Sequence, residues 1–168
     1  MSPLEIRQLI NTRLSGKVEV MYREDDPLKD LDGKILSGIH AFCFYGDKLV
    51  IVYAENKGYW TPPGGGIEKG ETYEQAIVRE VAEETNMRVL HQELIGYQDV
   101  YEPGRIVRQV RSFCIVEPIG DFVADPDGDI TEIKLVDFAD YTNYVRWPGP
   151  IADRLLTRVS ELKMKYSK

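Results

Sequence analysis

The chain has 168 residues, of which 43% are hydrophobic and 29% charged, a composition that suits one compact domain with its own core. Asp and Glu outnumber Lys and Arg by 28 to 21, which gives a net charge of −7 at pH 7. This balance argues against a general nucleic-acid or anionic-membrane surface, because polyphosphate backbones are bound by clustered Lys and Arg. A small phosphorylated ligand is still compatible with it, since a bound cation can invert the local sign of charge.

The two cysteines and the N-terminal sequence favour a cytoplasmic protein. Cys43 and Cys114 lie in apolar, strand-like runs, so we expect buried free thiols rather than a disulfide or a catalytic thiol. The first residues show no basic segment followed by a long apolar stretch, so no signal peptide is expected. No run approaches the roughly 18 apolar residues of a membrane span.

The first 35 residues are expected to begin with a helix. Ser2, Pro3 and Glu5 form a capping-box pattern with proline at the first helical position. Apolar residues then follow at helical spacing: Ile6, Leu9, Ile10 and Leu14. The pattern predicts a short helix that ends at Gly16, followed by a strand over 17–24 and a polar loop.

The rest of the chain mixes strands with two helices. Two apolar runs within 38–55 are split by a turn at Gly46-Asp47, which predicts a hairpin, and a turn-rich connector follows. Further elements are predicted as strands over 89–102, 105–118 and 130–138, a loop over 119–129, and an amphipathic helix over 150–166. Strands joined partly by short turns predict an α/β domain with a mixed sheet and helices on its faces.

Two smaller expectations concern arginine and tryptophan side chains in these elements. Arg108 and Arg111 alternate with valines, which predicts that they form the polar side of a strand. Trp147 is expected to anchor the last helix. The histidines show no partner pattern and receive no role.

A central helix is predicted over Tyr73–Thr85. Thr72 and Gln75 form a capping pair at its start, and Asn86 stands where a left-handed residue is needed at its end. Ile77 and Val81 share the stripe that should pack on the sheet.

A second stripe of this helix carries Glu80, Glu83 and Glu84, like charges that repel one another at this spacing. The glycines 64–66 come just ahead and leave backbone carbonyls accessible. Carboxylates with exposed carbonyls suit a hard divalent cation such as Mg²⁺ or Mn²⁺, which would relieve the repulsion. The alternative is a solvated acidic face, with Arg79 paired to Glu83 one turn away.

The spacing of these residues closely resembles the Nudix box. The pattern fixes nine positions over 23 residues, and eight of them match: Gly65, Glu71, Arg79, Glu80, Val81, Glu83, Glu84 and Met87. The chain departs at Asn86, where the family has glycine, and Asn is the next-best residue for a left-handed cap. The resemblance is strongest over 38–89 and implies a single domain over 1–168 with the Nudix fold, an α/β/α sandwich around a mixed sheet. Residues 1–35 look like an N-terminal helical extension.

The resemblance also implies a role for each box residue. Glu80, Glu83 and Glu84 would bind Mg²⁺ or Mn²⁺ directly or through water, with the Gly64 carbonyl as a further ligand. Arg79 would orient a box glutamate, and Glu71 would support the loop and the start of the helix. The general base varies in this family, so both Glu80 and Glu132 stay open for that role. Glu132 also fits the place of a fourth acidic metal ligand, or it merely lies at a strand edge.

Substrate choice lies outside the box. Trp60 could stack a base, although an aromatic residue near a strand end also suits the core. Pro103 lies where a subgroup that hydrolyses ADP-ribose has a proline, and Arg105 beside it could meet a phosphate, with Tyr101 flanking the same turn. The alternative for these residues is a solvated hairpin tip.

The function implied by the resemblance is metal-dependent hydrolysis of a nucleoside diphosphate linked to another group, such as a nucleoside triphosphate or a nucleotide sugar. ADP-ribose is one alternative substrate. A nucleotide-sensing module that does not cleave is another, although such modules usually lose box glutamates. Direct action on nucleic acid, such as cap removal, is disfavoured by the net charge of −7. The implied partner is therefore a small nucleotide, with no membrane, and the chain is expected to be a monomer or homodimer.

Overall fold

The computed structural model describes residues 4–12, 15–124 and 129–167. Within these residues one mixed sheet forms the centre of the molecule, with strand order β1-β2-β7-β8-β3-β4-β5. Two further strands pair off this path, β6 with β3 and β9 with β4. The strands are β1 (Glu5–Thr12), β2 (Gly16–Arg23), β3 (Lys34–Tyr45), β4 (Lys48–Ala54), β5 (Tyr59–Thr61), β6 (Gly64–Gly66), β7 (Met87–Glu102), β8 (Arg105–Pro118) and β9 (Ile130–Asp137).

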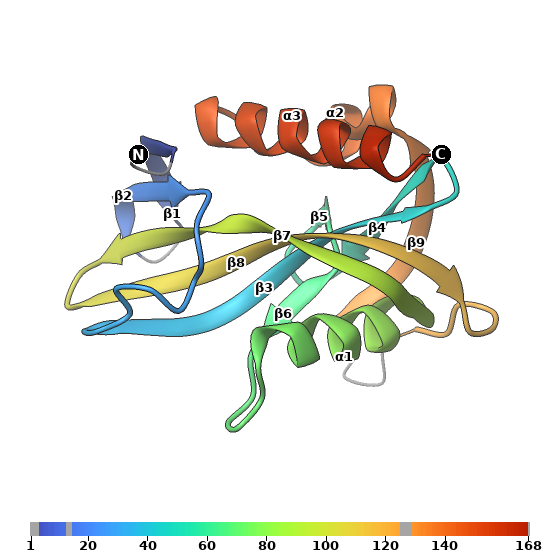
Figure 1. Cartoon of the computed structure of the whole chain (residues 1–168), viewed down its shortest axis with the longest axis horizontal. Helices are drawn as coiled ribbons and strands as arrows, with labels where there is room; N and C mark the ends of the chain where they lie inside the picture. The colour runs from blue at the N-terminus through green and yellow to red at the C-terminus, as the bar shows by residue number, and fades with distance from the viewer. Residues whose placement is uncertain (1–3, 13–14, 125–128, 168) are drawn as a thin grey trace.

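Helices cover both faces of this sheet. Helix α1 (Tyr73–Thr85) lies on one face, and α3 (Pro150–Lys165) crosses the other, with the short 3-10 helix η1 (Phe138–Asp140) and α2 (Tyr141–Tyr144) before it (Figure 1). Each face has its own cluster of buried apolar side chains, one packed against α1 and one against α3. The pairing of β3 with β8 is parallel and the other strand pairings among the described residues are antiparallel, which confirms the predicted mixed-sheet α/β sandwich.

The predicted N-terminal helix is wrong, because the segment is strand β1. It pairs antiparallel with β2 along its whole length, and its residues alternate between exposed and half-buried. Ile6 and Ile10 contact the core because alternate residues of a strand point to the same face. Their spacing of four residues fits a helix equally well. Leu9, which a helix would have buried with them, is 67% exposed. Pairing with β2 supplies backbone hydrogen bonds that local sequence cannot reveal. Ser2, Pro3 and Leu14 lie outside the described residues.

The other predicted elements are confirmed where the structure describes them, with small changes; residues 125–128 of the predicted loop lie outside the described residues. Helix α1 has the capping box of Thr72 and Gln75, and Asn86 caps its end in the left-handed region at φ 53°. The connector before it contains two short strands, β5 and β6. Helix α3 begins at Pro150 and buries the apolar stripe that includes Leu155 and Val159.

Two predictions about buried side chains have opposite outcomes. Cys43 and Cys114 are buried free thiols on neighbouring strands, as expected. Arg108 and Arg111 do not form a solvated side of β8, since they are 1% and 3% exposed. Alternation along β8 places them on opposite faces of the sheet.

No helix within the described ranges is long and apolar enough to cross a membrane.

Candidate active site

The glycine strand β6 lies directly against the glutamate stripe of α1. A Cβ built on Gly65 would meet the Glu80 carboxyl carbon at 2.5 Å, and one on Gly64 would overlap the Ile39 carbonyl oxygen. A side chain at position 64 would therefore collide with the backbone of β3, and one at position 65 would displace the Glu80 carboxylate from its place beside β6. The pairing of Gly64 with His40 on β3 fixes the other edge of β6.

Arg79 compensates much of the negative charge on α1. Its Nε and Nη2 donate to the two oxygens of Glu71 at 2.7 and 2.9 Å, and its Nη1 donates to Glu80 at 2.8 Å and Glu83 at 3.3 Å. Nη2 also donates to the Gly66 carbonyl oxygen at 2.8 Å. The pairing of Arg79 with Glu83 that the solvated-face alternative predicted is therefore present. It belongs to a larger network in which Arg79 also binds Glu71, Glu80 and the Gly66 carbonyl.

Glu71 is the most strongly held carboxylate of this network. The Arg79 guanidinium, with help from the Glu68 backbone N–H, lowers the pKa of Glu71 from 4.5 to about 2. The same carboxylates raise the pKa of Arg79 above its ordinary value. The fork of two parallel hydrogen bonds ties the loop before α1 to the middle of the helix. This geometry agrees with the supporting role expected for Glu71.

Glu84 is a buried carboxylate that contacts the glycine strand. It is 7% exposed, and its Oε1 accepts a hydrogen bond from the Gly64 backbone N–H at 2.9 Å. Glu80 is nearly as enclosed, with its side chain 13% exposed, whereas the Glu83 side chain is 41% exposed. Two glutamates therefore flank the Gly64–Gly65 backbone, and Glu83 turns toward Arg79.

The donor chemistry of this region fits a hard divalent cation, because carboxylate and carbonyl oxygens are the ligands that Mg²⁺ prefers. The glutamates do not yet converge on one point: within the described parts of the chain, no three His, Cys, Asp or Glu side chains group closely enough to hold a metal ion. The region supplies the right atoms, and two of its carboxylates, Glu80 and Glu83, accept hydrogen bonds from the same Arg79 Nη1.

A cavity of about 430 Å³ opens beside these residues. It is lined by the glycines 64–66, Glu84, His40 and Asp129 among others. The Asp129 Oδ1 and the His40 Nδ1 are buried in it without a hydrogen-bond partner among the described residues. Burial holds the pKa of His40 well below its usual value. A buried carboxylate oxygen that lacks a partner is costly unless a ligand completes it.

Sequence reasoning missed Asp129 and chose Glu132 from the same stretch. Glu132 is exposed on β9 opposite Tyr53 and lines neither this cavity nor the larger one described next. Asp129 precedes β9, and its backbone carbonyl accepts from the Glu55 N–H, which places it at the cavity. The available signal was its position just before the strand, since loop ends next to a sheet more often carry functional side chains than strand edges.

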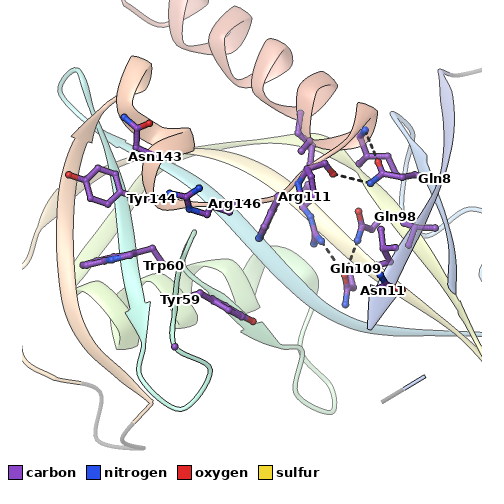
Figure 2. Close-up of a pocket in the computed structure, with 18 residues that line it drawn as sticks. Gln8, Asn11, Tyr59, Trp60, Gln98, Gln109, Arg111, Asn143, Tyr144 and Arg146 are labelled. Atoms are coloured by element: carbon purple, nitrogen blue, oxygen red, sulfur yellow. Dashed lines mark hydrogen bonds between the residues drawn. The ribbon is translucent and has the colours of Figure 1, made fainter. Parts of the chain in front are cut away.

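A second cavity of about 870 Å³ adjoins the first. Figure 2 shows Gln98, Gln109 and Asn11 gathered at one end beside Arg111, and Trp60, Tyr59 and Tyr144 at the other. Trp60 therefore reaches a cavity, as the base-stacking prediction requires. Its ring is also packed by Tyr53, with centroids 5.3 Å apart, so part of the core alternative holds as well.

Trp147 and Arg111 line both cavities. The Trp147 ring makes edge contacts with His40 at 5.2 Å and Phe42 at 6.3 Å between centroids, so it joins the segment before α3 to the sheet. The Arg111 guanidinium carbon lies 5.6 Å from the Trp147 ring centroid. The position of Trp147 between cavities was not predicted.

The structure does not bring Tyr101 and Arg105 to either cavity. Both lie near the turn between β7 and β8, at one end of the molecule in Figure 1. Arg105 pairs with Glu102 across this turn and is 58% exposed. Pro103 belongs to the same turn. These residues fit the solvated hairpin tip that was the alternative.

The comparison with protein-family models decides which family this site belongs to. The model described as the NUDIX domain matches residues 37–157. The chain belongs to the Nudix family. The glycine strand, α1 and Asp129 all fall inside the matched range, whereas β1 and β2 precede it.

Relatives and solved structures agree with the Nudix assignment. A protein named as the uncharacterized Nudix hydrolase YvcI of Bacillus subtilis is 34% identical over 50 residues, which is 30% of this chain and 32% of that protein. The crystal structure of the Bacillus subtilis pyrophosphohydrolase BsRppH has a TM-score of 0.70 at 18% identity, covering 92% of this chain and 97% of that one. A UDP-X diphosphatase has a TM-score of 0.60 at 18% identity, covering 80% of this chain and 68% of that one.

These likenesses confirm the Nudix fold. The chain spans between 32% and 58% of the length of three curated relatives that it matches. These two structural neighbours are under 25% identical to the chain, so the likeness concerns the fold alone.

Proposed function

We propose that this Nudix protein hydrolyses the phosphoric anhydride of a nucleoside diphosphate linked to another group and releases a nucleoside monophosphate. The observation that carries the proposal is the packing of Glu80 and Glu84 on the bare backbone of Gly64 and Gly65, beside a cavity where the buried Asp129 Oδ1 has no hydrogen-bond partner among the described residues. Two of the similar proteins are named as a pyrophosphohydrolase and a UDP-X diphosphatase, and both names describe cleavage of such a bond.

Glu80, Glu84 and the Gly64 carbonyl oxygen would hold a divalent cation, Mg²⁺ or Mn²⁺, with Glu83 on its exposed side. When bound, the cation neutralises the diphosphate charge and lowers the pKa of a bound water. Arg79 orients Glu80 through the hydrogen bond at 2.8 Å. Glu71 in turn fixes Arg79, so the carboxylates are positioned before a substrate arrives.

Asp129 is the candidate general base that the cavity favours. Its Oδ1 is buried without a partner in the described part of the chain, so it is available to accept a proton from an attacking water. Glu80 stays as the second candidate from the box itself. Glu132 would act only from the exposed edge of β9, and the geometry gives it no cavity to serve.

The test is product release from a panel of substrates, with Mg²⁺ and with chelator. The panel holds common and oxidised nucleoside triphosphates, nucleotide sugars, ADP-ribose and dinucleoside polyphosphates. The proposal expects metal-dependent formation of a nucleoside monophosphate from at least one of them. Binding of a nucleotide without cleavage of any would overturn the hydrolase in favour of a sensing module.

A paired substitution tests the base. Asp129→Asn should lower kcat by about 10²- to 10⁴-fold, the range typical for a positioned proton acceptor. Glu132→Gln serves as the matched control and should leave kcat within a few-fold of the wild type. The opposite ranking would return the role to Glu132.

A further inference from the structure

Arg111 lies where the two cavities meet. It lines both of them together with Gln109, Tyr59 and Trp147. A substrate whose diphosphate lies beside Glu84 must therefore pass Arg111 to place its remaining part in the larger cavity.

The charge of Arg111 is not balanced by a carboxylate in the part of the chain that the structure describes. Its Nη2 donates to the Gln109 Oε1 at 3.1 Å and its Nη1 to the Val110 carbonyl oxygen at 3.3 Å, while its Nε has no partner. No carboxylate of the described residues forms an ion pair with it, although it is 3% exposed. Burial lowers its pKa to about 10, so it stays protonated at neutral pH. A buried cation without a counterion is costly, and an anionic ligand would offset that cost.

The lining of the larger cavity reinforces this sign of charge. The chain carries a net charge of −7, yet among the described residues that line this cavity none is acidic and two are arginines, Arg111 and Arg146. Its volume of about 870 Å³ lies within the range of ordinary small-ligand sites. The cavity thus favours an anionic organic ligand over a cation.

The amide end of the cavity carries hydrogen-bonding groups that the protein leaves open. Gln98 and Gln109 face each other on β7 and β8, and the Gln98 Nε2 donates to the Gln109 Oε1 at 3.3 Å. This leaves the Gln98 Oε1 as an acceptor and the Gln109 Nε2 as a donor with no partner in the described parts of the chain. Every nucleobase has an edge with an adjacent donor and acceptor, and side-chain amides match such edges.

The N-terminal hairpin closes this end. The Gln8 Nε2 donates to the Pro148 carbonyl oxygen at 2.9 Å, and the Gln8 Oε1 accepts from the Ile151 N–H at 3.1 Å (Figure 2). These two bonds tie β1 to the start of α3. The wall of the cavity is therefore fixed before a ligand binds, which reduces the entropic cost of binding.

We propose that the larger cavity is the nucleotide subsite of this protein, in which Arg111 binds a phosphate oxygen and the amides of Gln98 and Gln109 bind the edge of a nucleobase. The inference rests on the proposed function for the location of the diphosphate. It goes beyond that function by assigning the base-recognition residues and by giving the N-terminal hairpin a part in the site.

The first experiment measures binding to the full chain by calorimetry in the presence of chelator, so that no turnover occurs. The probes are the four common nucleoside 5′-monophosphates, ribose 5-phosphate and inorganic phosphate. At least one nucleoside monophosphate should bind about tenfold or more tightly than ribose 5-phosphate, because only the former presents a base to the amides. Equal affinities for all probes would overturn the base assignment.

Two variants separate the base from the phosphate. Gln98→Leu should weaken the nucleoside monophosphate by about tenfold and leave ribose 5-phosphate unchanged. Gln92→Leu, on the same strand but outside the cavity, is its control. Arg111→Met should weaken both probes, with partial restoration in Arg111→Lys, and Arg88→Met at an exposed pair is the control for lost charge.

The outcomes distinguish this inference from the proposed function. If the wild type binds a nucleoside monophosphate as expected but cleaves no substrate, the subsite stands and the hydrolase falls. If it cleaves a substrate but Gln98→Leu and Arg111→Met bind every probe like the wild type, the hydrolase stands and this subsite is wrong.

Discussion

Arg108 and Arg111 lie three residues apart on β8, and the protein treats their charges in opposite ways. Arg108 donates to both oxygens of Asp99 at 2.8 and 3.0 Å, and its remaining hydrogens reach carbonyl oxygens of the 24–33 loop. Arg111, on the other face, has an amide and a carbonyl but no carboxylate among the described residues. The first arginine holds a loop on the sheet, whereas the second keeps its charge available at a cavity.

The difference shows how a buried charge can be assigned. Both side chains are almost fully buried, so exposure alone does not separate them. Their hydrogen-bond partners distinguish the two arginines. A complete set of hydrogen bonds marks a structural arginine, whereas an incomplete set points to a ligand. The same rule singles out Asp129 and His40 in the smaller cavity.

The largest expected effect concerns the structural arginine. Asp99→Asn should lower the free energy of unfolding by about 3–5 kcal/mol, because Arg108 would stay buried without its counterion. Chemical denaturation measures this change. Glu102→Gln, which removes the partner of the exposed Arg105, is the control and should cost less than about 1 kcal/mol. A small effect of Asp99→Asn would remove the contrast between the two arginines.

The second prediction extends the contrast to the glycine strand β6. Here two neighbouring glycines differ in how much room the structure leaves for a side chain. Gly65→Ala should reduce kcat/KM by about 10- to 100-fold, because the new methyl group would displace the Glu80 carboxylate. Gly66→Ala should behave like the wild type, since its Cβ would meet the Ser37 carbonyl oxygen only at 3.7 Å. Equal activities of the two variants would show that Glu80 tolerates displacement.

The third prediction uses pH to test the ion pair between Arg79 and Glu71, since Arg79, like Arg108, has carboxylate partners. The folded pKa of Glu71 is about 2, below its ordinary value of 4.5, so its contribution to stability is fully present above pH 4.5. It should be lost as the pH falls from 4.5 toward 2. The stability difference between wild type and Glu71→Gln, followed by urea unfolding, should therefore shrink over that window. A difference that stays constant with pH would contradict the Arg79 network.

The smallest expected effect is at Arg111. Arg111→Met should change the free energy of unfolding by no more than about 1 kcal/mol in either direction, because it removes a buried charge without orphaning a partner charge. Thermal or chemical unfolding measures it. A loss as large as that of Asp99→Asn would show that Arg111 is structural after all.

The sequence predicted most of the fold because local patterns and tertiary structure agree over residues 38–124 and 129–166. The capping pair at Thr72, the left-handed cap at Asn86 and the Gly46 turn are local signals that the structure keeps. The N-terminal strand was missed because Ile6 and Ile10 fit both a helix and a strand. Only the presence of β2 alongside decides between them.

The candidate site was predicted in part. The box residues could be found because their spacing is carried on one helix and one glycine strand. Asp129, His40 and Arg111 could not, because their importance lies in unpaired buried atoms. Such atoms are defined by what three-dimensional neighbours fail to provide, and alternation along β8 made Arg111 look solvated.

The proposal that Glu84 holds a catalytic cation can be tested directly. Nucleotide hydrolysis by the wild type and by Glu84→Gln is compared while Mg²⁺ is titrated. Gln can still accept the hydrogen bond from the Gly64 N–H, so the fold should persist while one metal-binding charge is lost. We expect the turnover of Glu84→Gln to be about 100-fold or more below that of the wild type, with an unchanged circular dichroism spectrum. Near-normal turnover of Glu84→Gln at saturating Mg²⁺ would contradict it.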